Sequence, residues 1–121
     1  MNSGLEWTEQ YDKISDATKM LFQAEDMAQV QREKPAAFKP NAHWNYSSGT
    51  TNLLSGILRQ QFKTHQDYLD FWYSALIDKI GMNSMLVETD MVGNYVGSSY
   101  GWATTRDWSK FGLLYLRKGN W

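Results

Sequence analysis

The chain has 121 residues, enough for one domain, or part of one, with a buried core. Its 12 basic and 13 acidic residues leave a formal net charge of -1, which provides no electrostatic attraction to nucleic acid or anionic lipid. Cysteine is absent, and no apolar run approaches the roughly 20 residues that a membrane helix needs. We therefore expect no nucleic-acid partner, no membrane span, and no metal or cofactor.

The first part of the chain contains two short helix patterns followed by a loop. Apolar residues recur at helical spacing after Ser15 and Asp16, which predicts a first helix there. Asp26 is placed to cap a second short helix, and Pro35 ends that helix because proline lacks the amide hydrogen that a helix needs. Residues 35–46 contain both prolines of the chain and are predicted to form a loop.

The clearest helix pattern runs from Gly49 to Phe62. Its apolar side chains fall on one side of a helix, at Leu53, Leu54, Ile57, Leu58 and Phe62. We expect this stripe to face a core.

Two further helices are predicted, separated by a segment without helical period. Thr64 followed by Asp67 resembles a capping box, and Gly81 suits the position just past the end of the same helix. In 82–102, two β-prone runs (85–89 and 95–99) lie among glycines, which favours short strands or an extended loop. A last helix is predicted from Thr104. It is expected to bury Trp108, Phe111, Leu114, Tyr115 and Leu116. The sequence therefore predicts a mainly α fold with a short irregular β segment.

One short motif indicates a different kind of protein. Residues 97–101 (Gly-Ser-Ser-Tyr-Gly) satisfy Gly-x-Ser-x-Gly, the turn that exposes the nucleophilic serine of α/β-hydrolases. That mechanism needs a helix directly after the serine and a histidine later in the chain as base. Both histidines, His43 and His65, precede Ser99, and the next predicted helix begins only at Thr104. An esterase that uses Ser99 is therefore the weaker interpretation.

Other titratable residues give weaker signals. His43 and His65 lie too far apart for a local metal pair, and neither has the helical spacing of a zinc motif. Glu88 and Asp90 lie two positions apart and would share one side of a strand, as a catalytic carboxylate pair would. Because the sequence identifies no partner for such a pair, surface charge is the better explanation.

The most informative segment for chemistry is Tyr46-Ser47-Ser48, directly before the helix pattern. A phenol with an ordinary pKa near ~10 is a poor base, but cations or helix N-terminal amides can stabilise its charged form. Ser48 would place a hydroxyl beside the phenol of Tyr46, either to relay a proton or to hold a substrate carbonyl. By spacing alone, a loop tyrosine and a helix-capping serine explain the same residues.

Four blocks of the sequence resemble one family. Residues 45–54 (Asn-Tyr-Ser-Ser-Gly-Thr-Thr-Asn-Leu-Leu) resemble the second signature of the serine β-lactamase, penicillin-binding DD-peptidase and esterase superfamily, a Tyr-x-Asn or Tyr-x-Ser triplet before a Leu-rich helix. Residues 1–5 resemble its Ser-Gly-Leu block, 79–82 its Pro-Leu-Gly-Met segment, and 101–116 its Thr-x-Arg-Asp helix. These blocks occur in the family's order. The resemblance implies a helical subdomain of the β-lactamase/transpeptidase-like fold.

Within that superfamily the chain is most similar to class C-like members, among them esterases and the 6-aminohexanoate-dimer hydrolase type, which also carry Ser at the third triplet position. The resemblance implies that Tyr46 and Ser48 are catalytic and act on a small-molecule amide or ester through an acyl-enzyme. β-Lactamases proper usually carry Asn where this chain has Ser48, so amide or ester substrates are favoured. Glu9-Gln10-Tyr11 resembles the Glu-Glu-Tyr segment of the hydrolase branch, which implies a substrate-binding role for Tyr11.

Two signatures of the family lie outside this sequence. The nucleophile belongs to a Ser-x-x-Lys motif, and no serine here is followed by lysine three residues later. Residues 63–65 imitate the third signature, Lys-Thr-Gly, only superficially. We therefore expect residues 1–121 to be a partial β-lactamase-like domain that is inactive alone and self-associates through an apolar face. The alternative is a self-contained helical binding module with an aromatic ligand groove.

Overall fold

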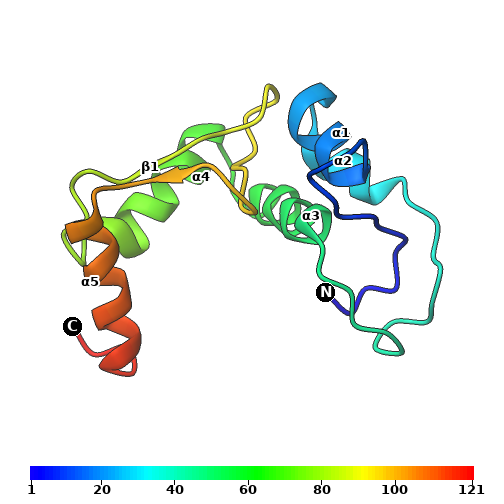
Figure 1. The fold of residues 1–121 in the computed structure, drawn as a ribbon. Helices are drawn as coiled ribbons and strands as arrows, with labels where there is room; N and C mark the ends of the chain where they lie inside the picture. Colours follow the sequence, from blue (N-terminus) through cyan, green and yellow to red (C-terminus); the bar gives the residue numbers. More distant parts are fainter. The chain divides into compact units, whose positions relative to one another are not determined.

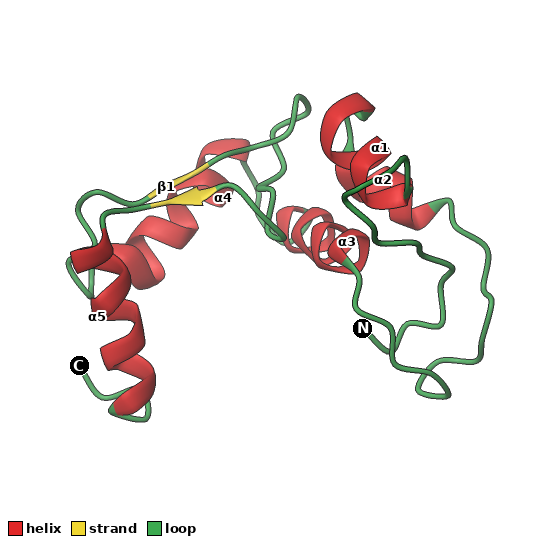
Figure 2. Ribbon diagram, viewed as in Figure 1, coloured by secondary structure: helices red, strands yellow, loops and turns green.

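The computed structural model describes residues 1–121 and shows a mainly helical chain with one two-stranded sheet. Figure 1 shows the order of the elements and Figure 2 their type. The chain divides into two compact units. Unit 1 comprises Met1–Gln61 and Thr89–Ser99, and unit 2 comprises Phe62–Glu88 and Tyr100–Trp121. None of the helices has the length and apolar character needed to cross a bilayer.

Three helices form the body of unit 1: α1 (Asp16–Gln23), α2 (Met27–Arg32) and α3 (Ser48–Arg59). The predicted cap of α2 is confirmed, because the side chain of Asp26 accepts a hydrogen bond from the amide of Gln29; the side chain of Ser15 caps α1 in the same way, accepting from the amide of Thr18. The chain between α2 and α3 has no helix, which confirms the predicted loop over 35–46. Helix α3 ends at Arg59, three residues before the predicted end.

Helix α3 buries a face of small and polar residues, and it packs against α2. The buried residues are Ser48, Gly49, Thr50, Asn52, Ser55 and Gly56. The two helices approach closely because glycine has no side chain: a Cβ at Gly56 would lie 2.6 Å from the Cβ of Ala28. The leucine-rich stripe is the more open side, with Leu54 and Ile57 exposed. The predicted helix is confirmed, but the expectation that this stripe faces a core is wrong for the structure.

The N-terminal segment of unit 1 lies along the loop between α2 and α3. Leu5 and Ala36 form an antiparallel bridge, and the carbonyl of Gly4 accepts from the amides of Ala37 and Phe38. Gly4 has a φ of +78°, and a Cβ there would lie 2.2 Å from the carbonyl oxygen of Phe38. Only glycine fits this conformation and this close approach. The pairing carries the chain from Gly4 toward the N-terminal end of α3.

A buried aspartate attaches the returning segment 89–99 to unit 1. Asp90 accepts hydrogen bonds from the backbone amides of Met27, at 3.1 Å, and Asn94, at 2.8 Å. Further along, the amide of Ser98 donates to Oδ1 of the buried Asn52, at 3.3 Å. These contacts hold 95–99 as turns and a bridge, so of the two predicted alternatives, short strands or an extended loop, no strand forms in this run.

Unit 2 consists of α4 (His65–Trp72), a π-helical turn η1 (Tyr73–Ile77), strands β1 (Leu86–Val87) and β2 (Gly101–Trp102), and α5 (Thr105–Leu116). The strands pair antiparallel, with Leu86 opposite Trp102. Ile77, Ile80 and Met82 form the buried core. The predicted caps are confirmed at Thr64 and Thr104, and Gly81 has the positive φ expected just past the helix end.

Helix α5 buries fewer side chains than its apolar content predicts. Phe111 and Leu114 pack against the core of unit 2. Trp108, Tyr115 and Leu116 are exposed, so the expectation that they are buried is wrong for the structure. Part of the apolar surface of α5 therefore remains open to solvent.

The carboxylate of Asp107 joins the first turn of α5 to the loop before β1. It accepts hydrogen bonds from Lys110 at 2.7 Å, and from the hydroxyl and amide of Ser84 at 2.6 and 2.8 Å. These donors lower the pKa of Asp107 from 3.8 to about 2. A lowered folded-state pKa adds stability above pH 3.8, and this contribution is lost as the pH falls toward 2.

We expect Asp107→Asn to lower the urea concentration at the unfolding midpoint at neutral pH. This midpoint should also decrease less as the pH is lowered, because the charged acceptor is gone. Urea unfolding at a series of pH values measures both effects. Asp78→Asn, at an exposed position near the end of the preceding helical segment, is the control and should keep the wild-type pH dependence. If the unfolding midpoint had the same pH dependence in wild type and Asp107→Asn, the stabilising role of the Asp107 carboxylate would be contradicted.

Candidate functional site

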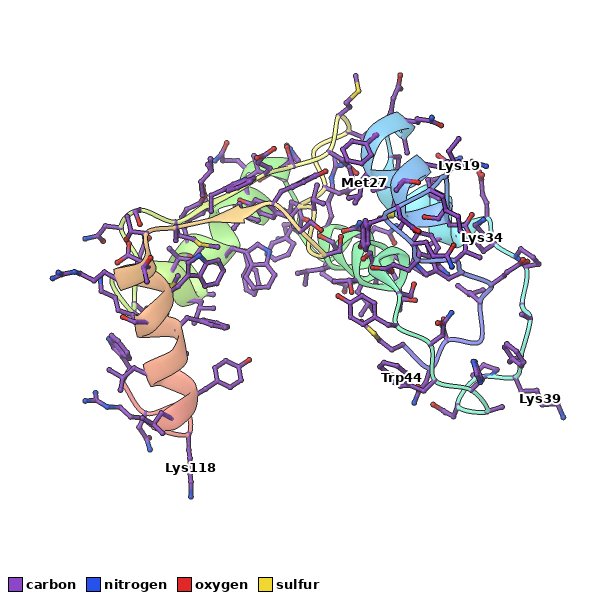
Figure 3. All side chains as sticks on the ribbon, in the orientation of Figure 1. Lys19, Met27, Lys34, Lys39, Trp44 and Lys118 are labelled. Carbon is purple, nitrogen blue, oxygen red and sulfur yellow. The ribbon has the colours of Figure 1, made fainter.

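The N-terminal end of α3 carries two of the predicted site residues. Ser47 is the N-cap, and its hydroxyl oxygen accepts from the amide of Thr50 at 2.9 Å. Ser48 is the first residue of the helix and is only 2% exposed. Tyr46 precedes the cap and is 54% exposed, with its phenol open to solvent. Trp44, labelled in Figure 3, is also exposed on the loop that leads into the helix.

A carboxylate from the N-terminal segment meets this helix end. Oε2 of Glu9 accepts from the amide of Ser48 at 2.7 Å, and Oε1 accepts from the hydroxyl of Ser48 at 2.6 Å. The phenol of Tyr11 donates to the same Oε1 at 2.6 Å. The indole of the buried Trp7 donates to Oε2 at 2.7 Å. Glu9 thus brings together Tyr11 and Ser48, which lie 37 positions apart in the sequence.

The environment of Glu9 favours its charged form. Partial burial by itself raises the pKa of this carboxyl, but the hydrogen bonds from Ser48, Tyr11 and Trp7 outweigh burial and hold the pKa below its ordinary value. Its position against the first amide of α3 is also favourable, because helix N-termini stabilise negative charge. Glu9 is therefore an ionised acceptor at neutral pH.

Tyr11 has the opposite shift. Its hydrogen bond to Glu9 is the main reason that its pKa is raised, and the charges of Glu9 and Tyr46 act in the same direction. A phenol with a raised pKa stays protonated and cannot act as a base near neutral pH. Tyr11 is 63% exposed, so its ring remains accessible to a ligand.

A small cavity lies beside this site in unit 1. Its volume is about 110 Å³, and its walls include Trp7, Asn45, Ser47 and Thr50. Two of these lining residues are joined directly, because the side-chain amide of Asn45 donates to the carbonyl of Trp7 at 3.1 Å. Pockets for drug-sized ligands are roughly 300 Å³ or larger, so this cavity is suited only to water or a very small group.

The remaining candidate residues are separate from this site. His43 stacks on Phe38 with ring centroids 4.5 Å apart, whereas His65 belongs to unit 2. Glu88 accepts from the indole of Trp102 at 2.6 Å, so it already has a partner of its own. No group of three or more His, Cys, Asp or Glu side chains is arranged to hold a metal ion.

The Gly-x-Ser-x-Gly segment lacks the structure of a nucleophile turn. The amide of Ser99 donates to the carbonyl of Val96, and the chain continues into β2 at Gly101 without an intervening helix. A nucleophile elbow requires a helix at that position, because the strained strand-to-helix turn exposes the serine. The structure therefore gives no support to an esterase that uses Ser99.

Sequence reasoning missed Glu9 as a site residue and considered only Tyr11 from this segment. The available signal was the spacing Glu-x-Tyr, but it becomes meaningful only when both side chains reach Ser48. Comparisons of the chain with protein-family models, curated proteins and solved structures return no match. Only the site and the sequence motifs therefore indicate a function for the chain.

Proposed function

We propose that residues 1–121 form the helical part of a serine hydrolase of the β-lactamase, DD-peptidase and esterase superfamily, which cleaves an amide or ester bond through an acyl-enzyme. The observation that carries this proposal is the meeting of Tyr11 and Ser48 at one carboxylate, at the start of the helix that the exposed Tyr46 precedes by two residues in the sequence. Tyr11 and Ser48, both singled out by motif resemblance, thereby meet at the start of one helix. They lie 37 positions apart, so nothing in the local sequence requires that convergence.

In the proposed reaction, a serine from a Ser-x-x-Lys motif attacks the substrate carbonyl and forms the acyl-oxygen bond. The lysine of that motif and Tyr46 together take up the serine proton and return it to the leaving amine or alcohol as the scissile bond breaks. Water then attacks the acyl-enzyme and releases the acid. Tyr46 suits this role because its phenol is exposed, whereas Tyr11 stays protonated and suits substrate binding.

The uncovered apolar surface of α3 supports the same proposal. Leu54 is 60% exposed and Ile57 is also exposed, on a helix whose other face is closely packed. In the resembled fold this helical region packs against a further helix and a sheet. Under this proposal, the further helix, the sheet and the Ser-x-x-Lys serine belong to parts of the hydrolase other than residues 1–121. The chain by itself should then self-associate through this surface.

A fluorophosphonate and a penicillin probe test the proposal. We expect no covalent labelling of the 121-residue chain, because its serines lack the lysine partner. The product of the surrounding reading frame should be labelled at a Ser-x-x-Lys serine. Stoichiometric labelling of the 121-residue chain would refute the absence of a nucleophile, and a reading frame without Ser-x-x-Lys would refute the family assignment.

One observation favours a binding module as the second candidate. Unit 2 has an open, mostly apolar groove of about 390 Å³, lined by Leu76, Phe111, Leu114 and Tyr115 among others. A self-contained module would be a compact monomer whose tryptophan fluorescence changes on ligand binding. The hydrolase proposal predicts oligomers instead, so light scattering on the purified chain distinguishes the two.

A further inference from the structure

The four hydrogen bonds to Glu9 determine which way the protons of the site point. A carboxylate can only accept, so the hydroxyls of Ser48 and Tyr11 must both be donors to Oε1. Each hydroxyl has one hydrogen. The two hydroxyl oxygens lie 3.4 Å apart, and neither has a hydrogen left for the other. Toward any other group, both oxygens offer lone pairs only.

This arrangement differs from the expectation that Ser48 holds a substrate carbonyl. A carbonyl oxygen needs a donor, and the hydrogen of Ser48 is already directed at Glu9. The amide of Ser48, which a helix N-terminus would otherwise present to an anion, is also directed at Glu9. Glu9 therefore occupies both donors of Ser48.

We propose that Glu9 is a positioning residue of this site: it fixes the hydroxyls of Ser48 and Tyr11 as hydrogen-bond acceptors for N–H or O–H groups of the reacting partners. The orientation of the two hydroxyls follows from the observed hydrogen bonds to Glu9. Its effect on the catalytic rate rests on the proposed function. Glu9 acts through Ser48 and Tyr11 and takes no direct part in bond cleavage. Its other neighbour, the indole of Trp7, is a fixed donor that holds the carboxylate in place.

Proton nuclear magnetic resonance of the 121-residue chain tests the geometry. The indole N–H of Trp7 and the amide N–H of Ser48 both donate to Glu9, so their signals should move together as the pH is lowered. The shared midpoint should lie below the ordinary pKa of glutamate, because the pKa of Glu9 is lowered. Tyr11, the titratable group in direct contact with Glu9, has a raised pKa and stays protonated throughout this range.

Glu9→Gln removes the titrating group and should abolish the common movement of both signals. Glu6→Gln, at an exposed position on the same segment, is the matched control and should leave it intact. If Glu9→Gln fails to fold, the wild-type titration still tests whether Trp7 and Ser48 both donate to Glu9. If the two signals move independently, or do not move, the proposal is overturned. Persistence of the common movement in a folded Glu9→Gln protein also overturns it.

The catalytic part is tested separately in the complete hydrolase. There Glu9→Gln should lower kcat/KM by roughly tenfold or more, as expected when a hydrogen bond to a charged group is lost. Glu9→Asp, which keeps the charge, should recover part of the loss. If both variants retain wild-type kcat/KM while the titration succeeds, the positioning role fails but the hydrolase proposal survives. If Ser-x-x-Lys is absent from the reading frame, the hydrolase proposal fails and the geometry of Glu9 remains.

Discussion

Replacing Tyr46 with phenylalanine is expected to lower the acylation rate of the complete hydrolase by about 100- to 10,000-fold, the usual contribution of a positioned general base. The phenol is exposed, so the change removes one hydroxyl without opening a cavity. Stability and fold should therefore be preserved. The loss should appear in kcat and kcat/KM together, because the phenol is proposed to act in the transition state.

Pre-steady-state acylation kinetics measure this effect, and circular dichroism confirms the fold. Tyr115→Phe provides the control, because its phenol is also exposed but lies on α5, in unit 2. This variant should react at the wild-type rate. A Tyr46→Phe protein that acylates within a few-fold of wild type would remove the central residue of the proposed mechanism.

The second large effect concerns the packing beneath the site. We expect Gly49→Ala to destabilise the protein by about 1 to 3 kcal/mol, the usual range for an overpacked core. A Cβ at this position would lie 2.2 Å from Oε1 of Gln31 and 2.6 Å from the ring of Trp7. Both side chains are buried, so neither can move away without disturbing its neighbours. Displacing Trp7 would also disturb Glu9, because its indole donates to that carboxylate.

Gly112→Ala is the matched control for this experiment. Gly112 lies within α5, and a Cβ there would meet no atom within 4 Å. The alanine should therefore stabilise the protein by about 0.5 to 1 kcal/mol through helix propensity alone. Urea unfolding of both variants measures the two changes. Equal changes of the same sign in the two variants would show that Gln31 and Trp7 do not exclude a methyl group at position 49.

The two glycines also separate local preference from tertiary packing. In an isolated helix, alanine is favoured over glycine at either position, so sequence reasoning predicts the same sign for both substitutions. The opposite outcome expected at Gly49 arises from Gln31 and Trp7, which belong to other segments of the chain. The same packing brings the buried Trp7 within reach of Glu9.

The helix starts that follow Ser15, Asp26, Thr64 and Thr104 are encoded locally, because each of these caps accepts a hydrogen bond from an amide only three residues away. Sequence also placed Tyr46 and Ser48 at the start of a helix. The buried face of α3 and the choice of Glu9 as the carboxylate of the site both depend on packing between segments that are distant in the sequence. Glu9 and Ser48 are 39 positions apart, and their contact depends on the pairing of Gly4 with the loop before α3. No pattern in the neighbouring sequence predicts such a contact, because the distance between Glu9 and Ser48 is set by how the chain folds between them.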